Sequence, residues 1–256
     1  MSVFPRVIPV LLVSDGYLVK PVKFHGEKYI GDPINAVRIF NEKQVDELVI
    51  CDIDASLKGT GVNYTLIEEI ASEAFMPVGY GGGVGSADEA RRITGIGIEK
   101  IVLNTAAVQR PETVTEISDA LGASSTVVSI DAKKRLTGGW DTYVRRGSSK
   151  TGMTPAEAAV RAQELGAGEI LVSSIDRESS FTGYDLKLIE SVADAVTLPV
   201  IALGGASGFG DFAPALEAGA SGVAAGSMFV LNGKHRAVLI SYPTPEQIRL
   251  LGEARR

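Results

Sequence analysis

Two pairs of adjacent glycines carry the clearest chemical signal in the chain. Gly82 and Gly83 follow the apolar run MPVGYG, and Gly204 and Gly205 follow the similar run LPVIAL. Because glycine has no Cβ atom, the backbone can approach a phosphate closely, and a following helix adds favourable dipole charge. The repeated pairs therefore predict two phosphate-binding sites; the alternative is that these glycines only form tight turns.

Each glycine pair has a polar companion one apolar run later. Asn104 and Thr105 follow the first pair, and Gly226 and Ser227 follow the second pair at the same separation. They offer a hydroxyl group and backbone N–H donors beside each site. Two sites that face each other across one ligand-binding opening predict a phosphorylated small molecule with a phosphate at each end.

Acidic residues stand where several apolar runs end. Asp131 ends the run VVSID, and a carboxylate in such a place can act as a general acid or base. Asp52 and Asp54 are expected to anchor loops through backbone hydrogen bonds instead. The first run, VIPVLLV, places Leu12 where the later run places Asp131.

Four charged residues stand at the opposite ends of the runs, just before they begin. They alternate in sign and can form a ring of ion pairs that closes the bottom of a barrel, where residues usually serve stability. These residues are Arg6, Glu47, Lys100 and Glu169.

Apolar runs rich in β-branched residues alternate with helical patterns along the whole chain. Continuous hydrophobicity is typical of parallel strands that are covered on both faces. The runs cover residues 7–13, 48–53, 77–80, 100–103, 126–130, 170–174, 199–203 and 222–225. Eight strand–helix units predict an α/β fold of the (β/α)8 TIM barrel class, as one domain over residues 1–256; a doubly wound sheet is the alternative.

An internal repeat favours the barrel. DELVICDID (46–54) parallels GEILVSSID (168–176), and the two glycine pairs are separated by the same number of residues. A barrel of two similar half-barrels explains this repeat, whereas a doubly wound sheet does not.

Two long segments are expected to overhang the mouth as lids, over residues 20–31 and 132–153. His25 lies in the first segment and can touch a ligand there. His235 is expected to be structural, and Cys51 is expected to lie in the core.

Composition excludes several classes of protein. The formal net charge of −6 argues against nucleic-acid binding, and no apolar run approaches the roughly 20 residues of a membrane span. A single cysteine and an N-terminus without a signal-peptide pattern indicate a cytoplasmic protein. We find no metal motif and no nucleotide P-loop, and we expect no cofactor.

The chain resembles a known family nearly end to end, the cyclase subunit of imidazole glycerol phosphate synthase. The resemblance rests on DELVICDIDAS, GYGGGV, KIVLNTAAV, SIDAK, GEILVSSIDR and LPVIALGGA, in that order. It implies a barrel with two phosphate sites and a glutaminase subunit docked on the bottom face as a heterodimer. Ammonia would pass through the barrel to a bisphosphate-like intermediate, which the family cyclises to imidazole glycerol phosphate and an aminoimidazole carboxamide ribotide.

The resemblance also assigns roles to residues. It makes the four charged residues at the strand starts a gate for ammonia, Lys20 the lysine of the mobile first loop, and Asp131 one of two catalytic aspartates. The other catalytic aspartate falls on Leu12. Glu178 and Ser179 stand where the family commonly has Asp-Gly in the second phosphate loop.

These departures resemble a narrower paralogue associated with surface-polysaccharide synthesis, through residues 22–48 and 226–243. That resemblance implies a subunit that delivers ammonia, with a glutaminase and possibly a separate sugar amidotransferase, to amidinate a nucleotide-activated sugar. Two alternatives stay open. The chain is a working cyclase of histidine biosynthesis in which Asp15 replaces the missing acid, or a non-catalytic scaffold that activates its glutaminase.

Overall fold

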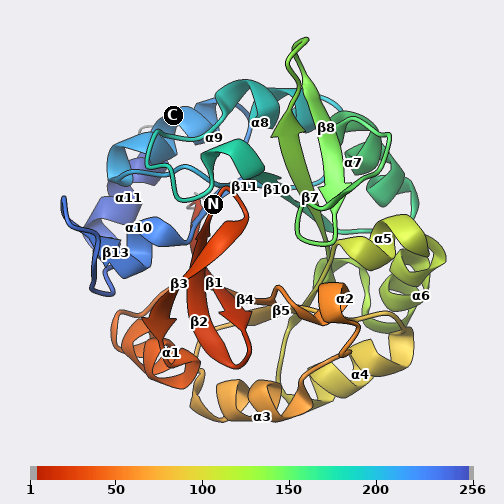
Figure 1. Ribbon diagram of the computed structural model, residues 1–256, viewed down its shortest axis with the longest axis horizontal. Coiled ribbons are helices and arrows are strands. Elements are labelled where there is room, and N and C mark those ends of the chain that lie inside the picture. Colours follow the sequence, from red (N-terminus) through yellow and green to blue (C-terminus); the bar gives the residue numbers. More distant parts are fainter. Residues whose placement is uncertain (1–4, 254–256) are drawn as a thin grey trace.

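Eight parallel strands close into a barrel in the computed structural model, which describes residues 5–253. Strand β12 pairs with β1, and the pairing continues through β4, β5, β6, β7, β10 and β11 back to β12. Figure 1 shows the strands in the middle and the helices around them. Closure confirms the (β/α)8 barrel and excludes the doubly wound sheet. The strands are β1 (Arg6–Ser14), β4 (Leu48–Asp52), β5 (Val78–Gly81), β6 (Lys100–Leu103), β7 (Thr126–Lys134), β10 (Glu169–Ser174), β11 (Val200–Leu203) and β12 (Gly222–Ala225).

The helices begin where the chain supplies capping side chains. The Asp32 carboxylate accepts the N–H of Asn35 at 2.8 Å, and Thr154 forms a capping box with Glu157. Both helices have proline at the start, where its missing N–H costs nothing. The helices are α1 (Pro33–Glu42), α2 (Ala55–Lys58), α3 (Tyr64–Glu73), α4 (Ala87–Ile96), α5 (Thr105–Gln109), α6 (Glu112–Leu121), α7 (Pro155–Glu164), α8 (Leu186–Ala193), α9 (Phe212–Glu217), α10 (Ser227–Val230) and α11 (Pro245–Glu253).

Side chains alternate along each strand between two apolar regions. One set, including Val7, Leu48 and Ile101, packs against the helices. The other set fills the barrel interior, where Ile8, Val49, Val102, Val127, Leu171 and Ile201 are buried together. The barrel is therefore a packed core along most of its axis and opens only toward the C-terminal ends of the strands.

Both predicted lid segments begin with antiparallel hairpins at the C-terminal ends of barrel strands. β2 (Tyr17–Val22) pairs with β1 and with β3 (His25–Gly31). β7 continues past the barrel to pair with β8 (Trp140–Val144), which pairs with the short β9 (Ser149–Lys150). The strand at 126–130 is consequently longer than predicted, because its end is paired outside the barrel.

Beyond the barrel, β13 (Leu231–Asn232) and β14 (Ala237–Val238) form a small hairpin before α11. Tyr242 then donates a hydrogen bond to the carbonyl oxygen of Val7 at 2.7 Å, which ties this segment to the start of β1. Of the helices within residues 5–253, none has the length and apolar character that crossing a bilayer requires.

Candidate functional site

A pocket of about 140 Å³ lies at the C-terminal ends of the barrel strands. In (β/α)8 barrels this end carries the ligand and catalytic residues. The residues that the sequence predicts for ligand binding and catalysis are therefore expected to lie in this pocket.

The first glycine pair and its polar companions line this pocket together. Gly82, Gly83, Asn104 and Thr105 all face it. A Cβ atom on Gly82 would lie 2.7 Å from the Cβ atom of Asp52, and the φ angle of Gly82 is 145°, so this position requires glycine. The structure therefore brings the first predicted phosphate-binding set to one wall of the pocket.

Asp131 lies in the same pocket and is nearly buried. Its Oδ2 atom accepts a hydrogen bond of 3.2 Å from the Asn104 side chain, which also donates to the carbonyl oxygen of Ser129 at 3.0 Å. Burial raises the pKa of Asp131 to about 7; the Asn104 hydrogen bond opposes the rise, and the charge of Glu178 adds to it. Near neutral pH this carboxyl can either donate or accept a proton.

Leu12 also lines the pocket, on the inner face of β1. An isobutyl side chain cannot transfer a proton or accept a hydrogen bond. Asp15, the residue that could replace the missing acid, is exposed and pairs with Lys58 at 2.6 Å. It does not line the pocket.

The second glycine set lies outside the pocket lining. Gly204, Gly205, Gly226 and Ser227 do not face the pocket. The hydroxyl groups of Ser227 and Ser179 lie 2.6 Å apart and hydrogen-bond to each other. The two predicted phosphate sets are thus in different states, one open to the pocket and one engaged by the loop after β10.

The second glycine pair is used for close backbone packing. A Cβ atom on Gly205 would overlap the carbonyl oxygen of Gly183, whose N–H donates to the Gly205 carbonyl oxygen at 2.9 Å. In the other half of the barrel, a Cβ atom on Gly83 would lie 2.7 Å from the carbonyl carbon of Gly61. The repeat therefore includes a glycine-to-glycine contact in each half, which the sequence alone did not reveal to us.

Lys20 reaches from the first hairpin into the barrel mouth and is 4% exposed. Its Nζ atom donates to the carbonyl oxygen of Val10 at 3.0 Å and lies against Gly226. Burial lowers the pKa of Lys20, and the negative charge of Glu178 opposes this shift. The lysine is therefore held inside the mouth, between the two predicted phosphate sets.

Two charged residues line the pocket although the sequence did not predict that they would face it. Glu178 is 5% exposed and lines the side nearer Lys20. Arg146, in the turn between β8 and β9, also lines the pocket and pairs with Glu27 at 2.6 Å and with Asp54 at 3.2 Å. The motif VRRGSS gave no sign of this placement, because it depends on how the hairpin folds over the mouth.

Cys51 packs against the apolar interior of the barrel, as expected of a core residue, and it also faces the pocket. It lines the pocket on the inner face of β4, next to Leu12. Burial raises the pKa of the Cys51 thiol to about 12, so the group is a neutral thiol and not a reactive thiolate. His25 and His235 are both exposed and do not line the pocket, where Phe24 takes the place expected for His25.

Asp52 and Asp54 hold loops, as expected. The Asp52 Oδ1 atom accepts the backbone N–H groups of Asp54 and Ala55, both at 3.1 Å. Asp54 accepts hydrogen bonds from Ser14 at 2.6 Å and Lys58 at 3.0 Å. Asp52 also borders the pocket, and burial raises its pKa.

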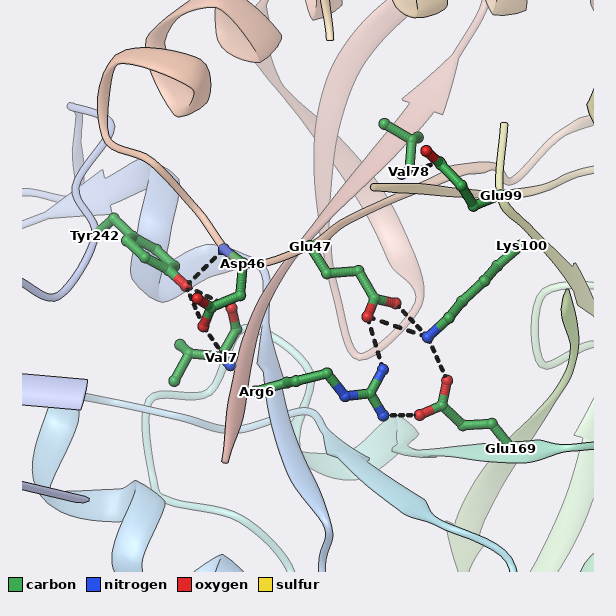
Figure 2. A network of polar contacts seen from close by, with 9 residues as sticks. All are labelled: Arg6, Val7, Asp46, Glu47, Val78, Glu99, Lys100, Glu169 and Tyr242. Carbon is green, nitrogen blue, oxygen red and sulfur yellow. Dashed lines mark hydrogen bonds and ion pairs between the residues drawn. The ribbon is translucent and has the colours of Figure 1, made fainter. Parts of the chain in front are cut away.

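The four charged residues at the strand starts form a closed ring of ion pairs (Figure 2). Lys100 contacts Glu47 at 2.9 Å and Glu169 at 2.8 Å, and Arg6 contacts Glu47 at 2.7 Å and also Glu169. The two glutamates are nearly buried, whereas the Arg6 side chain is 33% exposed. The ring covers the N-terminal end of the barrel interior.

A small cavity of about 10 Å³ lies directly inside this ring. A cavity of this size holds about one water molecule. Glu47, Lys100 and Glu169 form its outer side, and Val102 and Leu171 line both this cavity and the pocket at the other end. Only apolar side chains of the barrel interior separate the ring from the pocket.

The fold and the pocket define a (β/α)8 barrel protein with a polar ligand site at the C-terminal ends of its strands. The chain matches the family described as "Histidine biosynthesis protein" over residues 6–236. It belongs to this family, and within it to the group that resembles the cyclase subunit of imidazole glycerol phosphate synthase.

Several curated relatives cover nearly the whole chain. The "Putative imidazole glycerol phosphate synthase subunit hisF2" of Pseudomonas aeruginosa is 49% identical over 239 residues, 93% of this chain and 95% of the relative. A Leptospira interrogans protein of the same type, with the name ending in HisF, is 46% identical over 94% of this chain and 96% of its own. The "Imidazole glycerol phosphate synthase subunit HisF" of Streptomyces griseus is 41% identical over 90% of this chain and 91% of its own.

Proposed function

We propose that this protein is a cyclase-like subunit of a glutamine-dependent amidotransferase complex, which delivers ammonia through its barrel but does not perform the usual cyclisation. The observation that carries the proposal is the combination of an intact charged ring at one end with Leu12 opposite Asp131 at the other. A two-acid cyclisation has only one of its acids here, and loss of a general acid or base typically costs about 10²–10⁴-fold in rate.

The ring supports ammonia entry. Each glutamate accepts from both cations, so the ring excludes water and ions while it is closed. Lys100 is the most movable member, because a lysine side chain can change rotamer more readily than an arginine whose planar group bridges both glutamates. The small cavity and the apolar interior beyond it suit a small neutral molecule and disfavour ammonium, whose charge would be costly to bury.

The ammonia source in this proposal is a glutaminase subunit on the bottom face, around the ring. The relatives' names place them in a synthase with subunits, which agrees with such a partner. The acceptor is a carboxyl-derived or acylamino group of a nucleotide-activated sugar, converted to an amidine in the cytoplasm during surface-glycan synthesis. A separate sugar amidotransferase would activate that group.

Asp131 would act as a proton acceptor both in amidination and in cyclisation. A carboxyl with a pKa of about 7 is partly deprotonated at neutral pH, so it can take a proton from nitrogen after ammonia has attacked. Asn104 fixes its orientation through the 3.2 Å hydrogen bond.

The second candidate is the cyclase of histidine biosynthesis. The name of the Streptomyces relative favours it. It requires a second acid near Asp131, and Asp15 is exposed and paired with Lys58. A third candidate, a scaffold that only activates its glutaminase, predicts stimulation of glutamine hydrolysis with no ammonia emerging in the barrel.

The experiment that tests delivery uses the protein with its glutaminase subunit and glutamine labelled with ¹⁵N in the amide group. We expect this protein to stimulate glutamine hydrolysis, and the Lys100→Met variant to alter the fraction of ¹⁵N ammonia released directly to solvent. Stimulation that is identical in both, with the same release of ammonia to solvent, would contradict passage through the ring.

A further inference from the structure

The two ends of the pocket differ in the hydrogen-bond donors that they leave open, and this difference bears on the ligand. Gly82, Gly83 and Thr105 form one wall, and Arg146, which pairs with Asp54 in the loop after β4, also lines the pocket. The Arg146 Nε atom is buried and has no hydrogen-bond partner within the part of the chain that the structure describes. Arg146 is already paired with Glu27 and Asp54, so this end offers an unused donor and the open backbone of the glycine pair rather than a free cation.

At the opposite end the wall carries a buried carboxylate. Glu178 faces the pocket there, and its charge acts on both neighbouring titratable groups, raising the pKa of Asp131 and opposing the lowered pKa of Lys20. A phosphate at this end would meet a carboxylate in a site shielded from water, where like charges repel strongly. Lys20 carries one positive charge and Glu178 carries one negative charge, so the two residues together give this end no net positive charge.

The hydrogen-bond donors of the second phosphate set are also engaged. Ser179 donates to the carbonyl oxygen of Pro21 at 2.7 Å, so the hydrogen bond between Ser179 and Ser227 takes its proton from Ser227. That hydroxyl has no proton left for a phosphate oxygen. Lys20 lies against Gly226 and covers the close backbone approach that this glycine would allow.

Backbone conformation and a backbone hydrogen bond hold the loop after β10 over the second phosphate set. Ser179 has a φ angle of 57°, in the left-handed region where glycine is favoured, and the carbonyl oxygen of Glu178 accepts the N–H of Lys23 at 3.1 Å. The loop after β10 and the first hairpin are thereby joined over the second set. Ser179, which stands where the family commonly has glycine, makes the side-chain hydrogen bonds that close this site.

We propose that the pocket binds a ligand with phosphate at one end only, held at the Gly82–Gly83 wall, and that the Glu178 end receives a neutral or cationic hydrogen-bond donor. The inference rests on the proposed function only in taking the barrel mouth as the ligand site. An amidine, the product proposed above, is a cation that donates hydrogen bonds and suits a wall with the carboxyl groups of Glu178 and Asp131. A ligand with a phosphate at each end does not suit it.

The test is calorimetric titration of the purified protein with ribulose 5-phosphate and ribulose 1,5-bisphosphate, which differ by one phosphate. We expect the monophosphate to bind at least about tenfold more tightly, because the Ser227 hydroxyl and the backbone at Gly226 are already engaged and Glu178 repels a second phosphate. In the Glu178→Gln/Ser179→Gly variant this preference should disappear or reverse. The matched control Glu190→Gln makes the same chemical change on the exposed face of α8 and should keep the preference.

Ser179→Gly alone is the second variant, because glycine is at ease at this φ angle and the protein should fold. It frees the Ser227 hydroxyl and should lower the preference for the monophosphate while Glu178 remains. Tighter binding of the bisphosphate by the unmodified protein, or binding of neither ligand, overturns the proposal. Neither ammonia nor a glutaminase is present in the titration, so its outcome is independent of whether the barrel delivers ammonia.

Discussion

Leu12 on β1 and Asp131 on β7 line the same pocket, so the barrel presents one carboxyl group and one isobutyl group where two acids would be needed for the usual cyclisation. The opposite end of the same barrel keeps all four charged residues of its ring. The residues proposed for ammonia entry therefore differ from those needed for cyclisation, and each set can be tested alone.

Replacing Leu12 by aspartate tests the missing acid. We expect Leu12→Asp to stay inactive as a cyclase by itself, because the Glu178 end still disfavours the second phosphate. Combined with Glu178→Gln and Ser179→Gly, it should raise cyclisation by about 10²-fold or more above the single variant. The measurement is formation of imidazole glycerol phosphate from the ribulosyl intermediate with ammonium salt as nitrogen source.

Leu12→Asn is the control for this series, because the amide has the shape of aspartate and cannot transfer a proton in the same way. Full activity in the asparagine version, or in the unmodified protein, would show that the first acid is not what limits cyclisation.

Asp131 makes stability depend on pH in a defined direction. Its pKa is raised to about 7 in the folded protein, above the value of about 3.9 expected when unfolded. The folded state therefore binds the extra proton, and the free energy of unfolding falls as pH rises between these values. Asp131→Asn should remove this slope and leave the variant more stable at pH 8 by about 1–3 kcal/mol.

Urea unfolding at pH 4 and pH 8 checks this, with Asp119→Asn on the exposed face of α6 as the control. A slope that persists in Asp131→Asn would assign the pH dependence to another group.

The ring should contribute to stability as well as to entry. Lys100→Met leaves Glu47 and Glu169 facing each other with only Arg6 between them, and removal of one partner from such a buried set costs about 2–4 kcal/mol. Arg91→Met breaks an exposed pair with Asp88 and should change the free energy of unfolding by less than about 1 kcal/mol. Equal losses in the two variants would mean that the ring behaves as an ordinary surface network.

Ser179 should control how firmly the first hairpin is held. Ser179→Ala removes the hydrogen bonds to Pro21 and Ser227, which we expect to cost about 1–2 kcal/mol. The backbone N–H of Lys23 donates to the carbonyl oxygen of Glu178. Hydrogen exchange at this amide should become faster, and exchange in α7 should stay unchanged. The neighbouring Ser180→Ala is the control, and similar exchange in both variants would argue against the closure described above.

The barrel could be predicted because its signals are local and repeated. Apolar runs, proline-initiated helices and the duplicated glycine pairs each depend on a few neighbouring residues, and the strand bounds differ from those predicted mainly at the ends. The exception is β7, whose last residues pair with β8 outside the barrel.

The site was only partly predictable, because its charges meet through loops distant in the chain. Arg146 reaches the pocket on a turn whose residues 145–147 all have positive φ angles, and its partners Glu27 and Asp54 lie far away in the sequence. Glu178 was visible as a departure from a motif, yet its effect on Asp131 and Lys20 required the folded geometry. The same holds for Cys51, whose side of the strand only the register decides.

The most direct test of the account mixes this protein with its glutaminase subunit, glutamine and the ribulosyl intermediate of histidine biosynthesis. The measured quantities are glutamate and imidazole glycerol phosphate. We predict that glutamate forms while little or no imidazole glycerol phosphate appears. Imidazole glycerol phosphate formed in step with glutamate would contradict the separation of ammonia delivery from cyclisation.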